Sequence, residues 1–218
     1  MALDVASLSA HSTSLQQAKV LERSNSLRRK IEAWIDIQHL YIPSIAVLRA
    51  RADQQGGGKP VAVQDIELLL PSALMGRHIV PIDFLRYEWR LRLTHGEETL
   101  ADLRSLLLMS SMMYKSKKHH MRGQKQQTRS QKLITGVQER ITTAAGKYRR
   151  IREALIKLST ALLESSAWEK TLQALHDDDL VGLTSMDDDG PEGRKKLSWI
   201  WKVQGMQLED DKNTQAGE

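Results

Sequence analysis

The chain of 218 residues has no cysteine and only one phenylalanine. The lack of cysteine excludes disulfides, cysteine-ligated zinc sites and cysteine nucleophiles. Aromatic residues make up 5% of the chain and leucine dominates its apolar residues, which suits packing between helices better than a β-sandwich core. No apolar run approaches the roughly 18 residues of a membrane-spanning helix, and the mean hydropathy is −0.44, so we expect no membrane partner.

Signals for export, catalysis and cofactor binding are also missing from the sequence. The N-terminus has no basic segment followed by an apolar core, so we predict no secretory signal. The GGGK sequence at 56–59 lacks the spacing of a phosphate-binding loop. The adjacent His119 and His120 would point about 100° apart on a helix, which prevents chelation of zinc from one face. We therefore expect no enzymatic activity and no cofactor.

Two segments carry apolar or small residues at alternating steps of three and four. The first stripe is Trp89, Leu93, Gly96, Leu100, Leu103, Leu107, Ser110 and Tyr114, and the second is Ile134, Val137, Ile141, Ala144, Tyr148, Ile151, Leu155, Leu158 and Leu162. This heptad pattern is typical of long helices that pack along each other. The polar segment KSKKHHMRG at 115–123 separates them. The sequence therefore predicts an all-α fold built on a long antiparallel helical hairpin with a basic tip.

Gly96 is the expected weak point of the first hairpin helix, which should open at Pro81 and run to about Lys118. A glycine inside a helix costs about 1 kcal/mol relative to alanine. Pro81 is well placed as a first helical residue because it has no N–H to leave unpaired.

The N-terminal third of the chain is predicted to brace this hairpin. Residues 1–25 show no sustained stripe, and we expect a flexible tail there. A helix should begin near Ser26 and kink at Pro43, which has no backbone N–H. Together with the hairpin it would form a helical domain of residues 26–163, interrupted by the Gly-rich linker at 53–60.

The C-terminal segment, residues 164–218, is acidic and is expected to be largely disordered. Its acidic triplets at 177–179 and 187–189 are interpreted as solvated runs and not as a metal site. Within this segment, LSWIWKV at 197–203 is expected to be ordered. Its Leu, Trp, Trp and Val stand at every second position, which predicts a short strand. We expect its Trp199 and Trp201 to form a patch for self-association or for a catalytic-core partner.

The charge is distributed unevenly along the chain. Residues 112–157 hold 13 Lys and Arg against 2 acids, a net charge of +11, whereas residues 164–218 hold 6 basic and 13 acidic residues, a net charge of −7. This asymmetry indicates either a polyanionic partner or two ends of the chain that meet each other. A basic face can also be simply a solvated helix surface. If the partner is DNA, the candidate phosphate-contacting residues are Lys115, Lys117, Lys118, Arg122, Lys125, Arg129, Lys132, Arg149 and Arg150.

Six segments in order resemble the C-terminal helical region of fungal Kyakuja-Dileera-Zisupton (KDZ) transposases. They are RRKIEAWIDIQHLYIPSI (28–45), IELLLPSAL (66–74), EWRLRLTHGEETLADLRSLL (88–107), RGQKQQTRSQKLITGVQERITTAAGKYRRIREAL (122–155), WEKTLQALHDDDLVGL (168–183) and RKKLSWIWKV (194–203). The resemblance covers most of residues 26–203. It implies a mobile-element DNA transposase, with DNA as the partner and the nucleus as the location.

In that family a cysteine cluster and a ribonuclease-H-like core with metal-binding carboxylates precede this region. The present chain has neither cysteine nor a β-rich run that could build such a core. The resemblance therefore implies a non-catalytic fragment or truncated copy that contacts DNA or braces a missing catalytic core. The alternative is a coiled-coil-type interaction module whose stripes dimerise and whose basic tip binds an acidic partner. A decayed fragment with no selected activity is a third interpretation.

Overall fold

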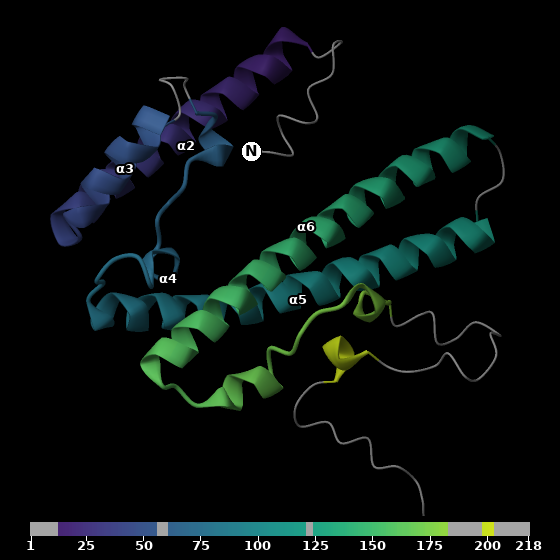
Figure 1. Ribbon diagram of the computed structural model, residues 1–218. Coiled ribbons are helices and arrows are strands. Elements are labelled where there is room, and N and C mark those ends of the chain that lie inside the picture. Colours follow the sequence, from purple (N-terminus) through teal and green to yellow (C-terminus); the bar gives the residue numbers. More distant parts are fainter. Residues whose placement is uncertain (1–12, 56–60, 121–123, 183–197, 203–218) are drawn as a thin grey trace, which may run out of the picture. The chain divides into compact units, whose positions relative to one another are not determined.

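The computed structural model describes residues 13–55, 61–120, 124–182 and 198–202 (Figure 1). Within these ranges the chain forms α-helices, 3-10 helices and turns, and no strand, which confirms the predicted all-α class. The chain divides into two compact units, Met1–Phe84 and Leu85–Glu218. Each unit is described by itself below.

In the first unit, helix α2 (Ser14–Tyr41) begins twelve residues earlier than the sequence predicted. A capping box fixes this start: the Gln16 backbone N–H donates to Thr13 Oγ1 at 3.3 Å, and the Thr13 N–H donates to Gln16 Oε1 at 3.0 Å. These two bonds satisfy donors that a helix N-terminus otherwise leaves unpaired. Residues 14–25, which the sequence assigned to the tail, therefore belong to α2, and residues 1–12 lie outside the described part of the chain.

The chain turns back on itself at Pro43, where the sequence predicted a kink. Helix α2 ends at Tyr41 and helix α3 begins at Ser44 and runs to Gln55. Arg49 Nη2 donates to Gln38 Oε1 at 3.0 Å. Eleven residues of continuous helix would separate them by about 16 Å, so this bond requires a reversal. Because Ile42, Ile45 and Leu74 are buried together at the turn, folding back covers more apolar surface than a bend would.

Two short helices complete the first unit. The 3-10 helix η1 (Val63–Asp65) is followed by α4 (Pro71–Leu74), which begins at Pro71, a residue well suited to the first turn of a helix. The loop between them is held by α2: Gln38 Nε2 donates to the carbonyls of Leu68 and Leu69 at 2.9 and 2.8 Å. Of the predicted linker at 53–60, residues 53–55 belong to α3 and residues 56–60 lie outside the described part.

The second unit contains the predicted hairpin. Helix α5 (Ile82–His120) and helix α6 (Gln124–Leu162) have 39 residues each and lie side by side (Figure 1). Their facing apolar residues form a seam, whose buried members on α5 and α6 include Leu100, Leu103, Leu107, Ile134, Val137, Ile141, Tyr148, Ile151, Leu155 and Leu158. These are the residues of the two heptad stripes. The predicted antiparallel hairpin is confirmed, except that Tyr114 at the end of the first stripe is exposed.

The chain after α6 crosses back over the hairpin. Leu163, at φ 55°, ends α6, and the following segment contains the 3-10 helices η2 (Ser166–Lys170) and η3 (Asp177–Asp179). A further 3-10 helix, η6, spans Trp199–Trp201. We call residues 164–182 and 198–202 the strap. Its side chains Trp168, Leu172, Leu175 and Ile200 are buried in the same core as the seam.

The strap contradicts two predictions for the C-terminus. Residues 164–182 are ordered helices and turns packed on α5 and α6, and not a disordered acidic segment. Trp199–Trp201 is a 3-10 helix and not a strand, because the Ser198 hydroxyl caps it by accepting from the Ile200 N–H. Residues 183–197 and 203–218, including the second acidic triplet, lie outside the described part.

Candidate nucleic-acid interface

Two sets stand out among the basic residues of the hairpin, and the first set holds the strap. Arg104 Nε donates to the Ile200 carbonyl at 2.6 Å, Arg149 Nε to that of Leu175 at 3.0 Å, and Arg152 Nε to that of Leu172 at 3.1 Å. Each bond pairs a cation with a backbone acceptor of the strap. These arginines are therefore structural clamps.

Two of the clamps also meet acids of the strap. Arg149 Nη2 lies 2.6 Å from Asp177 Oδ1, and Arg152 Nη2 lies 3.6 Å from Glu169 Oε2. The Arg152 guanidinium also lies 5.8 Å from the ring centroid of Trp168, a cation–π distance. The two oppositely charged parts of the chain thus contact each other, one of the two interpretations of the charge asymmetry.

Tyr148 anchors the strap at its middle. Its hydroxyl donates to the Gln173 carbonyl at 2.8 Å, and its ring packs on Trp199 with centroids 6.3 Å apart. Burial raises the pKa of this hydroxyl well above its ordinary value, while the nearby charges of Arg152 and Arg104 act in the opposite direction. A neutral donor at this place suits a carbonyl acceptor.

Trp199, Trp201 and the acidic triplet at 177–179 also help to hold the strap on the hairpin. Trp199 packs on the hairpin core, and Trp201 Nε1 donates to the Val181 carbonyl at 2.8 Å. The surface that these two tryptophans contact belongs to their own chain. Asp179 accepts from the His176 N–H at 2.9 Å and from the Ser198 hydroxyl at 3.2 Å, so the triplet is not merely a solvated run.

The structure separates the nine predicted phosphate-contacting residues. Arg149 is a clamp, and Lys117 Nζ donates to Gln131 Oε1 at 2.6 Å, whereas Lys115 is exposed. Arg129, Lys132 and Arg150 are exposed on α6 and form no ion pair among the described residues. The side chains of Lys118, Arg122 and Lys125 lie outside the described part of the structure.

The second basic set runs along one side of α6. We call it the basic stripe, and it consists of Arg129, Lys132, Arg140, Lys147 and Arg150. In the heptad repeat of α6 these residues occupy three neighbouring positions around the helix, and the clamps Arg149 and Arg152 occupy the two positions next to them. All are exposed except the half-buried Lys147, and none forms an ion pair within the described ranges. The stripe is about 32 Å long at 1.5 Å per residue.

Arg140 and Lys147 were not among the residues predicted from the sequence, because they stand next to the seam in the heptad register. Arg140 and Lys147 are seven residues apart and so lie on the same face of the helix, and this spacing could have identified them as part of the stripe.

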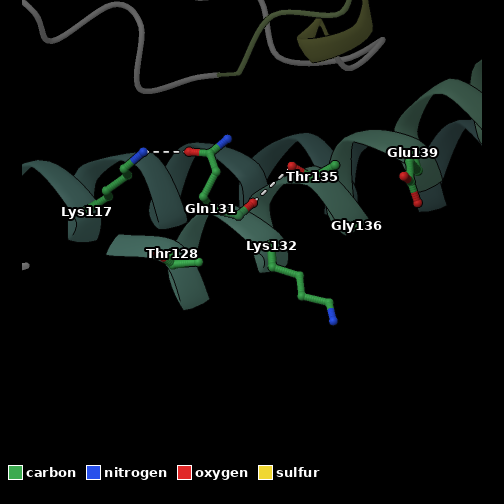
Figure 2. A pocket seen from close by; sticks show the side chains of 7 residues that line it. All are labelled: Lys117, Thr128, Gln131, Lys132, Thr135, Gly136 and Glu139. Carbon is green, nitrogen blue, oxygen red and sulfur yellow. Dashed lines mark hydrogen bonds between the residues drawn. The ribbon is translucent and has the colours of Figure 1, made fainter. Parts of the chain in front are cut away.

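A hollow of about 680 Å³ lies where the stripe approaches the tip of the hairpin. It is lined by Lys117, Thr128, Gln131, Lys132, Thr135, Gly136 and Glu139 (Figure 2). Figure 2 shows Lys117 of α5 bonded to the Gln131 amide, while Lys132 extends in another direction. Its lining side chains include two amines and one carboxylate, while apolar atoms make up the larger share of the lining surface. The two amines are the groups in the hollow that could pair with an anion.

In the described ranges no three His, Asp or Glu side chains are grouped so that they could hold a metal ion. None of the helices described is both long and apolar enough to cross a membrane. Comparison of the chain with models of protein families, with curated proteins and with solved structures gave no match.

Proposed function

We propose that this chain is a non-catalytic helical module that contacts duplex DNA through phosphates, like the C-terminal region of a KDZ-type transposase, with a nuclear location. The observation that carries the proposal is the basic stripe. Five cations share one side of α6 and none of them forms an ion pair among the described residues, although one carboxylate, that of Glu139, lies on the same side. A solvated helix surface usually mixes both signs at i,i+4 spacing, as Glu153 and Lys157 do elsewhere on α6.

The shape of the stripe favours phosphate contact over base recognition. Duplex DNA carries one negative charge per about 1.7 Å of its axis, so a line of cations about 32 Å long meets many phosphates at once. The stripe lies along the flank of a long hairpin and not at the N-terminal end of a short recognition helix. Such contacts position a protein on DNA without reading its sequence.

The competing interpretation, a coiled-coil-type interaction module, loses one of its two supports. It required the heptad stripes to pair between chains. Both stripes are buried within the hairpin of one chain, where Leu103 and Ile141 have no exposed surface. The other support, an acidic protein partner for the basic stripe, is distinguished from DNA by the binding experiment described next.

Fluorescence anisotropy with duplexes of unrelated sequence, at several salt concentrations, tests the proposal. The test variant changes Arg129, Lys132, Arg140 and Arg150 to Gln. A control variant loses the same charge from the first unit, with Lys19, Arg29, Lys30 and Arg51 changed to Gln. All eight residues are exposed, so both variants should melt like the wild type.

We expect the wild type to bind all duplexes similarly, with a steep fall of affinity as salt rises. The slope of log K against log salt should become shallower by about 0.9 for each stripe cation that contacts phosphate. The control should keep most of the slope. Absence of binding at low salt, or equal slopes in both variants, would remove the DNA proposal and favour an acidic protein partner.

A further inference from the structure

Gly136 lies in the interior of α6, where glycine is unfavourable relative to alanine. A packed neighbour does not explain it, because a β-carbon built on Gly136 would meet no atom within 4 Å. Gly96 on α5 differs, since a β-carbon there would lie 2.8 Å from Leu172 Cδ1. The close packing of Leu172 therefore favours a glycine at 96, and no packed neighbour favours one at 136.

The position of Gly136 relates it to the basic stripe. It holds the same heptad position as Arg129, seven residues before it, and Arg150, fourteen residues after it. Lys132 and Arg140 lie one turn to either side of it, at i−4 and i+4. At Gly136 the stripe therefore lacks a side chain between two cations. It also lacks one at Gly146, where Arg150 Nη1 lies 3.7 Å from the β-carbon position, whereas no atom lies within 4 Å at Gly136.

This place is also part of the hollow described above. Gly136 lines it together with Lys132 and with Lys117, whose amine is held by Gln131. The hydroxyl of Thr135 lies at the same edge and donates to the Gln131 carbonyl at 3.0 Å. Small side chains and a bare backbone segment leave room for a group that carries its own oxygen acceptors.

We propose that this hollow seats one phosphate of the DNA backbone, with Gly136 keeping the seat open between Lys132 and Arg140. The inference rests on the proposed DNA contact and names the place where the contact is closest. Glu139 is the one carboxylate in the lining, and it opposes an anion in the hollow.

The first test fills the seat. Gly136→Leu adds a side chain into the hollow, and Thr143→Leu adds one at the same heptad position one repeat later, outside the hollow. Leucine is a better helix former than glycine, so Gly136→Leu should melt at a higher temperature than the wild type. Its affinity for a 20-bp duplex should nevertheless fall about tenfold, the equivalent of one charge-assisted hydrogen bond. Thr143→Leu should bind within about twofold of the wild type.

The second test removes the opposing charge. Glu139→Gln should tighten DNA binding about two- to threefold. Glu164→Gln, the same change in the strap just beyond the end of α6, should not.

The outcomes separate the two proposals. If the wild type binds DNA and Gly136→Leu binds as Thr143→Leu does, the phosphate seat is wrong and the stripe proposal stands. If Glu139→Gln and Glu164→Gln have equal effects, the seat is likewise wrong. If the wild type does not bind, the proposed function fails first, and the seat fails with it. Loss of binding in Gly136→Leu alone, with raised melting temperature, supports the seat.

Discussion

Leu172 of the strap packs directly against the backbone of α5 at Gly96. A β-carbon at Gly96 would lie 2.8 Å from Leu172 Cδ1 and 3.5 Å from Ile151 Cγ2. The glycine that looked like a weak point of the helix is therefore a place where the strap, α5 and α6 pack closely together. What the helix loses in propensity is offset by burial of Leu172, which is 1% exposed.

Replacing this glycine should weaken the fold although it favours the helix. Gly96→Leu should destabilise the second unit by about 1–3 kcal/mol, because the added side chain overlaps a packed core. Gly146→Leu is the matched control, since the nearest atom to a β-carbon there is Arg150 Nη1 at 3.7 Å. Urea unfolding followed by circular dichroism measures both. Equal stability of the two variants would mean that Leu172 does not occupy this place.

Charges placed in the seam should be far more damaging than charges placed beside it. Leu103→Asp or Ile151→Asp buries an unpaired carboxylate, which should cost about 3–5 kcal/mol. Ile156→Asp on the same helix is the control, because Ile156 is 42% exposed. Thermal melting should fall by roughly 10 °C or more for the first two and little for the third. Wild-type melting of Leu103→Asp would contradict the seam.

Tyr148 should make the fold sensitive to alkali. Its pKa is raised in the folded state, so the unfolded state loses its proton first as the pH passes the ordinary tyrosine value of about 10. The stabilisation is present below that pH and is lost as the pH rises above it. Urea midpoints measured from pH 8 to 11 should therefore fall more steeply for the wild type than for Tyr148→Phe. Parallel curves would show that this hydroxyl is not buried.

Adjacent arginines on α6 should behave in opposite ways. Arg149→Gln removes a clamp on the strap and should cost about 1 kcal/mol of stability, while leaving the salt slope of DNA binding unchanged. Arg150→Gln should leave melting unchanged and make the slope shallower by about 0.9. If Arg149→Gln alters the slope as Arg150→Gln does, Arg149 leaves the strap when DNA binds.

The chain alone should not cut DNA. No carboxylate group suited to a metal pair is present in the described ranges, and we expect plasmid to stay intact with Mg²⁺ or Mn²⁺. Cleavage that persists through further purification and disappears on mutation of one carboxylate would overturn the non-catalytic proposal.

The hairpin could be predicted because the signal for it is repeated. Seventeen positions over two segments keep the heptad spacing, so Ile141 or Leu155 could be placed in the core from its neighbours alone. The start of α2 was also available, since Thr13 followed three residues later by Gln16 is a capping box. It was missed because no apolar stripe follows it.

The strap could not be predicted because its contacts leave little trace in the sequence. Its apolar anchors Trp168, Leu172 and Leu175 are spaced four and three residues apart, as on a helix, but three residues are too few to show which surface they cover. The alternating apolar and polar residues at 197–203 are also compatible with a strand. In the structure they form a 3-10 helix whose N-terminus is capped by the Ser198 side chain. Arg149 was assigned to the DNA-contacting set because nothing local shows that Leu175 and Asp177 return to it.

The clamp arginines hold the strap through hydrogen bonds to its main-chain carbonyls, those of Leu172, Leu175 and Ile200. Every amino acid carries that acceptor, proline included. Outward-facing positions such as Gln173 and Ala174 are therefore free to drift over evolutionary time, provided that the apolar anchors still fill the core. Two chains descended from a common ancestor can keep this clasp while their strap sequences become unrecognisable to each other.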